Sequence, residues 1–103
     1  MKANPEKVVV IDVMDCVSGT TTPFEAASLF KKMKESLVDG CSVKLSMLNV
    51  TPMSSSFLNA SFGELFDLFG YQTIKDRITL IEYKPSQAKQ IKDYLDTISK
   101  LVK

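Results

Sequence analysis

The sequence contains no histidine, and it has only two cysteines among its 103 residues. Histidine is the commonest general base and a frequent metal ligand, so its absence removes every Ser-His or Cys-His nucleophile pair. Cys16 and Cys41 lie far apart and form no Cys-x-x-Cys motif, which favours two reduced thiols over a disulfide or a metal site. These absences predict a protein that is not an enzyme and that holds no metal or cofactor.

Long apolar runs and a strong excess of one charge are also missing. The longest apolar stretch is far shorter than the roughly 20 residues that a bilayer requires, and no apolar leader follows the polar start. The formal net charge is +1, which provides no electrostatic footprint for nucleic acid or anionic lipid. We therefore expect a cytoplasmic protein without a nucleic-acid or membrane partner. The length predicts a single domain, residues 1–103.

Two periodicities are present and predict the secondary structure. Apolar or alternating runs indicate strands at 7–13, 42–50 and 77–83, and a hairpin arm at 14–18 would add a fourth. The run KVVVIDV at 7–13 favours a strand covered on both faces. Apolar stripes at helical spacing predict helices near 22–38, 55–69 and 85–101. The alternation predicts an α/β fold, with a three- to four-stranded, mostly parallel sheet packed by about three helices.

The start of the first helix has a clear capping signature. Thr22 suits the N-cap, Pro23 the first helical position, and Glu25 completes a Thr-x-x-Glu capping box. The hydroxyls of Thr20, Thr21 and Thr22 also lie where a helix dipole favours an anion, but the spacing and lysine of a phosphate-binding loop are missing. These threonines predict a helix cap and, more weakly, an anion site.

Three serines follow the strand at 42–50 and precede the helix at 55–69. Ser54, Ser55 and Ser56 could cap that helix, bind an anion, or form a phosphorylatable switch. A catalytic serine is excluded, because the turn lacks the flanking glycines of a nucleophile elbow and the chain lacks histidine. Because the carboxyl ends of parallel strands share one edge, we expect Asp12, the three threonines and the serines to converge there.

The same helix suggests a contact surface for a partner. Phe57 and Leu68 lie about 100° round from the centre of the apolar face, beside Glu64. We predict that these three residues contact a protein partner, the alternative being that neighbouring helices cover them. Gly63, inside this helix, predicts the close approach of a neighbouring element.

The segment VKLSMLNVTPMSSS at 43–56 resembles the central strand and switch loop of STAS domains, the fold of bacterial anti-sigma factor antagonists. Its continuation through Phe57, Leu58, Phe62 and Gly63 is similar to the largely uncharacterised STAS-like alternative family. The resemblance covers residues 18–98. In classical antagonists the loop reads Asp-Ser-Ser/Thr-Gly, and a partner kinase phosphorylates the first serine. By position Ser55 matches that serine, Ser54 replaces the aspartate and Phe57 replaces the glycine, so a carboxylate is lost and a ring is gained.

The resemblance implies a small bacterial regulatory module that binds a protein partner and is switched by serine phosphorylation. The implied partner is a histidine-kinase-type ATPase or an anti-sigma-like regulator. The residues alone leave a second possibility open, a small anion- or nucleotide-binding α/β domain that uses helix-end amides and has no catalytic activity.

Overall fold

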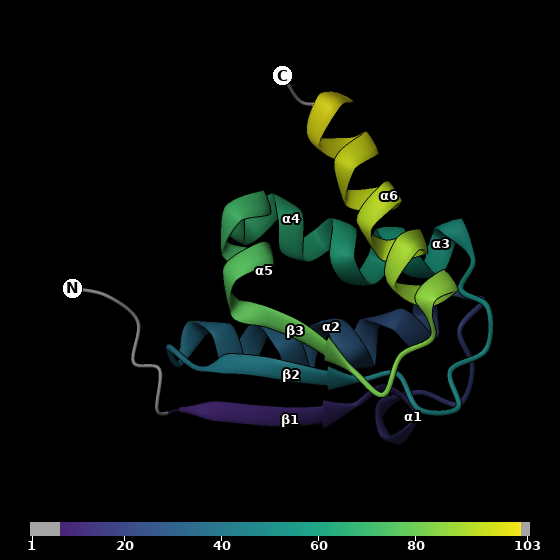
Figure 1. Ribbon diagram of the computed structural model, residues 1–103, viewed down its shortest axis with the longest axis horizontal. Coiled ribbons are helices and arrows are strands. Elements are labelled where there is room, and N and C mark those ends of the chain that lie inside the picture. Colours follow the sequence, from purple (N-terminus) through teal and green to yellow (C-terminus); the bar gives the residue numbers. More distant parts are fainter. Residues whose placement is uncertain (1–6, 102–103) are drawn as a thin grey trace.

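The computed structural model describes residues 7–101 and contains one parallel sheet of three strands. The strands are β1 (Val8–Asp12), β2 (Ser42–Ser46) and β3 (Ile78–Ile81). They lie in the order β1-β2-β3, with β2 in the centre, and both pairs are parallel (Figure 1). The predicted α/β class, with a mainly parallel sheet, is confirmed.

Within residues 7–101, seven helical segments connect and cover the strands. They are α1 (Val13–Cys16), α2 (Pro23–Val38), α3 (Ser55–Leu58), the π-helix η1 (Asn59–Gly63), α4 (Glu64–Phe69), α5 (Tyr71–Arg77) and α6 (Pro85–Leu101). The helices predicted near 22–38 and 85–101 are α2 and α6. The segment predicted as a helix at 55–69 is helical throughout, but its middle part, η1, is a π-helix between two α-helical parts, α3 and α4. The prediction of about three helices is too low, because α1 and α5 were not expected. Within residues 7–101, none of these helices combines the length and hydropathy needed to cross a membrane.

The fourth strand expected at 14–18 is wrong, because this segment begins with the one-turn helix α1. The Asp12 carboxylate accepts a hydrogen bond from the Met14 amide at 3.1 Å and caps that turn. An aspartate at the N-cap accepts a hydrogen bond from a main-chain amide of the first helical turn, which has no partner within the helix. Val13, the first residue of α1, and Val17, its C-cap, are both buried. The chain therefore leaves the sheet directly after β1.

Two other strands are shorter than expected because turns cut them. Asn49 has a φ of 64° and Glu82 a φ of 52°, so both lie in the left-handed region where strands cannot continue. The Val50 amide donates to the Met47 carbonyl and closes the first of these turns. The strands predicted at 42–50 and 77–83 therefore end at Ser46 and Ile81.

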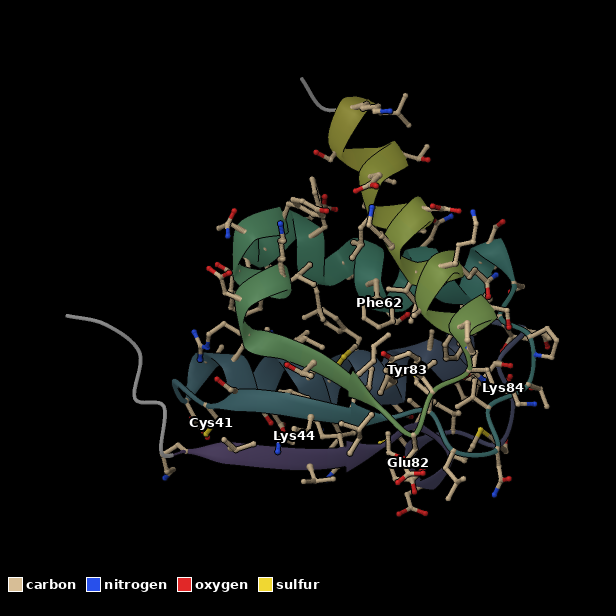
Figure 2. The ribbon with its side chains drawn as sticks, viewed as in Figure 1. Cys41, Lys44, Phe62, Glu82, Tyr83 and Lys84 are labelled. Atoms are coloured by element: carbon tan, nitrogen blue, oxygen red, sulfur yellow. The ribbon has the colours of Figure 1, made fainter. Side chains whose placement is uncertain are left out.

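Helices cover one face of the sheet. Val43 and Leu45 of β2 are buried, and α2 packs against this strand through a stripe that includes Leu29 and Met33. On the other face, Val10, Lys44 and Thr79 are exposed, and Lys44 is labelled in Figure 2. The expectation that β1 is covered on both faces is therefore wrong. The fold has two layers, with the core between the sheet and the helices.

The interruption of the 55–69 helix lies against α6. Gly63 is the last residue of η1, and a Cβ atom there would lie 2.5 Å from the Tyr94 hydroxyl oxygen. That hydroxyl donates a hydrogen bond to the side chain of Asn59 in the same π-helix. The predicted close approach at Gly63 is confirmed, and the approaching residue is Tyr94.

Candidate functional site

The serine turn lies beyond the carboxyl end of β2, and Ser54 is its structural centre. The Ser54 hydroxyl accepts a hydrogen bond from the Phe57 amide at 3.0 Å, which makes it the N-cap of α3. The same hydroxyl donates to the Thr21 carbonyl at 2.8 Å, and the Ser54 amide donates to the Thr20 carbonyl at 3.0 Å. Ser54 therefore joins the start of α3 to the residues that precede α2.

Thr20 holds the segment immediately before the serines. Its side chain is only 1% exposed. Its hydroxyl oxygen lies 2.7 Å from the Thr51 hydroxyl and 2.9 Å from the Pro52 carbonyl. A buried hydroxyl needs such partners because its burial without them would be unfavourable. Thr20 is therefore an anchor for the loop and does not face solvent.

Helix α6 holds the same loop from the other side. The side-chain amide of Gln87 donates to the Val50 carbonyl at 3.0 Å, and that of Gln90 donates to the Met53 carbonyl at 2.8 Å. Gln87 is buried. Residues 50–54 are thus fixed between the start of α2 and the first turns of α6. Sequence reasoning missed both glutamines, and no motif in the chain marks them.

Ser55 and Ser56 differ from Ser54 in their environment. Both are exposed on the first turn of α3. Among residues 7–101, neither hydroxyl forms a hydrogen bond to another described residue. Of the three predicted serines, these two present free hydroxyls to solvent, whereas Ser54 is part of the frame.

The predicted partner surface is corrected at Phe57. This side chain is completely buried, because α3 packs against α2 and turns the ring into the core. Glu64 and Leu68 are exposed as expected. However, they lie on α4, 9 and 13 residues after Ser55, or about 14 and 20 Å along the helical run at 1.5 Å per residue. The three residues do not form one surface with the serines.

Phe24 lies three residues after Thr21, whose carbonyl accepts a hydrogen bond from Ser54, and sequence reasoning missed it. It is on the first turn of α2 and is 87% exposed. The bond from Ser54 to Thr21 holds this helix start beside the start of α3. In the sequence, Phe24 lies outside the apolar stripe of its helix, and this position is the sequence feature that indicates its exposure.

The threonines form a cap, and the groups around them disfavour the weak anion site predicted there. The Thr22 hydroxyl accepts from the Glu25 amide at 3.2 Å and donates to the Glu25 carboxylate at 3.0 Å. The same carboxylate accepts from the Ser18 hydroxyl at 3.1 Å. Because the protein's own carboxylate occupies this helix end, an external anion would be repelled. Thr21 is exposed, and its carbonyl bonds to Ser54.

The expected convergence at the sheet edge is thus only partly observed. The threonines at 20–22 and the serine turn do come together. Asp12 instead uses its carboxylate to cap α1, and it lines a separate groove with Asp15.

The fold and the serine-bearing turn define an α/β domain of the STAS-like type. Residues 25–88 match the model of a protein family described as a STAS-like domain of unknown function (DUF4325). This match covers more than half of the chain, from α2 through the serine turn to the start of α6, and the chain belongs to this family. Searches of curated proteins and of solved structures gave no significant match.

Proposed function

We propose that this domain is a regulatory protein-interaction module whose docking surface consists of Phe24, Ser55 and Ser56. We call these three residues the serine face. The observation that supports it is that two free hydroxyls lie on a turn held in place by Thr20, Gln87 and Gln90. A preorganised surface loses little conformational entropy when it binds, so such a turn favours recognition. The proposal involves binding and no catalysis.

Phosphorylation of Ser55 is the proposed means of control, with Ser56 as the second site. A phosphate adds about −1.5 to −2 charges at pH 7. Ser55 begins a helical run that extends to Phe69, and negative charge is favoured at a helix start. The domain would therefore stay folded after modification, and the new charge would act on the partner. Ser54 is unsuited, because its hydroxyl already bonds to Thr21 and Phe57.

The proposed partner follows from the family resemblance and from the chemistry of the surface. The proposed partner is a histidine-kinase-type ATPase or an anti-sigma-like regulator. Such a partner would bind the serine face and would also phosphorylate it. Phe24 supplies an exposed aromatic ring on the helix start that Ser54 joins to the serine turn, and aromatic side chains often anchor protein interfaces. A bacterial source and a cytoplasmic location are parts of this proposal.

The test is capture of partners from the native host with wild-type protein and with three variants. Ser55→Glu introduces negative charge on the serine face, and Phe24→Ala removes its aromatic ring. Leu68→Ala is the matched control, because Leu68 is also exposed but lies on α4. We expect one partner to bind the wild type and the Leu68 variant and to be lost from the other two.

Mass spectrometry of the protein purified from that host tests the modification itself. We expect phosphate on Ser55 or Ser56 and none on Ser54. If the Ser55 and Phe24 variants are folded by circular dichroism and retain every partner, the serine face is not the docking surface. A thermal-shift screen with nucleotides covers the alternative, since a ligand at 100 times its Kd stabilises by about 2.7 kcal/mol.

A further inference from the structure

The outer margin of β1 is an open sheet edge with an unusual composition. Within the part of the chain that the structure describes, β1 pairs only with β2, and Figure 1 shows no described element along its other side. Val8 is 44% exposed and Val10 is 62% exposed. Natural edge strands are usually covered or carry charges that prevent pairing with other chains. The side chains of Val8 and Val10 place no charge on this stretch of the edge.

Among residues 7–101, the outward main-chain groups of β1 also have no strand partner on this side. The Ser42 amide donates to the Lys7 carbonyl at 2.9 Å, and Val8 is in register with Ser42. Alternate residues of a parallel strand direct both main-chain groups to the same neighbour. Val9 and Ile11 therefore face β2, and the amides and carbonyls of Val8 and Val10 face outward. An added strand would find two donor–acceptor pairs.

A groove of about 420 Å³ follows this margin between β1, α1 and α2. Its charged lining residues are four acids and one base, a formal charge of −3: Asp12, Asp15, Glu35, Asp39 and Lys32. Burial raises the pKa of the Cys16 thiol in the same groove; Lys32 opposes this shift, and Asp15 and Asp12 add to it. The thiol is therefore neutral at pH 7 and leaves the groove acidic.

We propose that the outer edge of β1 adds an extended, basic segment of a partner protein as a fourth strand. Pairing with the main chain of Val8 and Val10 would provide affinity. Lysine or arginine side chains at alternate positions of the segment would reach the acidic groove and provide selectivity. This site is separate from the serine face, which lies beyond the carboxyl end of β2, and it does not depend on the function proposed there.

Charge distinguishes this partner from a second copy of the chain. β1 has the sequence VVVID and contains no basic residue. Pairing of two β1 strands edge to edge would therefore bring two acidic grooves together at one margin, where like charges repel. A basic segment removes that repulsion.

The first experiment compares the binding of two synthetic peptides. In one peptide lysine alternates with valine, and in the other glutamate replaces each lysine. We expect the lysine peptide to bind at least tenfold more tightly. Hydrogen exchange measured by NMR should slow at least tenfold for the Val8 and Val10 amides. The Val9 and Ile11 amides, which already face β2, should not change. Equal binding of the two peptides, or no added protection at Val8 and Val10, would overturn the proposal.

Variants separate the main-chain contribution from the charge contribution. Val10→Pro deletes an outward amide. If circular dichroism shows that this variant is unfolded, the variant Val10→Lys is used in its place. Glu35→Lys combined with Asp39→Lys reverses charge on α2 and at its C-cap without changing the strand. Each should weaken the lysine peptide at least tenfold. Glu64→Lys combined with Asp67→Lys makes the same charge change on α4 and should have no effect.

Two further measurements address self-association and the serine face. If sedimentation shows a dimer that Val10→Lys dissociates, the edge is a self-interface and the basic-segment proposal is wrong. Ser55→Glu should leave peptide binding unchanged, so the two proposals can fail separately.

Discussion

The hydroxyl of Ser54 joins the starts of two helices, because it accepts from the Phe57 amide of α3 and donates to the Thr21 carbonyl before α2. Replacing an N-cap serine by alanine typically lowers stability by about 1 kcal/mol, and up to about 2. We expect Ser54→Ala to lower the free energy of unfolding by about 1–2 kcal/mol, measured by urea denaturation. Ser55→Ala and Ser56→Ala are the controls and should stay within about 0.5 kcal/mol of the wild type. Three equal effects would contradict the joining role of Ser54.

Replacement of Thr20 tests the anchor of the loop. Valine has the shape of threonine but cannot bond to Thr51 or Pro52, so those polar groups would lose a buried partner. Thr20→Val should destabilise the protein by about 1–3 kcal/mol. Amides near Thr51 and Met53 should exchange faster with deuterium. Thr79→Val, on the open face of the sheet, makes the same chemical change and should alter neither property.

Two phenylalanines should respond to alanine in opposite ways. Phe57 is fully buried, and Phe57→Ala should lower the free energy of unfolding by about 3–5 kcal/mol through lost transfer energy and a cavity. Phe24 is 87% exposed, and Phe24→Ala should change stability by less than about 0.5 kcal/mol. Chemical denaturation of both variants measures this contrast. A large destabilisation by Phe24→Ala would show that its ring packs in solution.

The pH dependence of stability should carry a contribution from Asp96. The Tyr71 hydroxyl donates to this carboxylate at 2.8 Å and lowers the pKa of Asp96, and Lys92, at 3.1 Å, lowers it further. Because the folded pKa lies below the unfolded value of about 3.9, the contribution is full above that pH. It is lost as the pH falls through the folded value.

The variant Asp96→Asn removes this contribution. Its free energy of unfolding should be below that of the wild type at pH 7, and the difference should disappear as the pH falls from about 4 toward 2. Urea denaturation across this range measures it. Asp93→Asn breaks an exposed ion pair with Lys89 and should differ little from the wild type at any pH. A constant difference for Asp96→Asn would contradict the assignment.

The helices with local start and stop signals were predicted best. α2 begins at Pro23 and ends at Val38, within one residue of the predicted range. Its end signals are local: Thr22 and Glu25 cap its first turn, and Gly40 follows its last turn. The failures have identifiable physical causes. A uniform rotation of 100° per residue does not hold across the π-helix η1, so the sequence spacing does not give the true relative positions of Phe57 and Leu68 round the helix. The segment at 14–18 departs from the predicted strand because the Asp12 cap starts the one-turn helix α1 there.

The position of the serine turn could be predicted, but its support could not. The rule for parallel sheets places a loop after β2 at the edge where Thr20 also lies. The contacts that hold the loop join residues more than 30 positions apart in the sequence. No periodic pattern encodes such contacts, because they depend on how the packed elements meet.

These long-range contacts also determine when the serine face exists during synthesis. A nascent chain that has emerged only as far as Ser56 carries both hydroxyls but lacks Gln87 and Gln90, which hold the loop from α6. Non-local contacts form only after the intervening chain has closed, so the turn acquires its shape late in folding. A partner that recognises the fixed turn would therefore bind completed domains and ignore unfinished or unfolded ones.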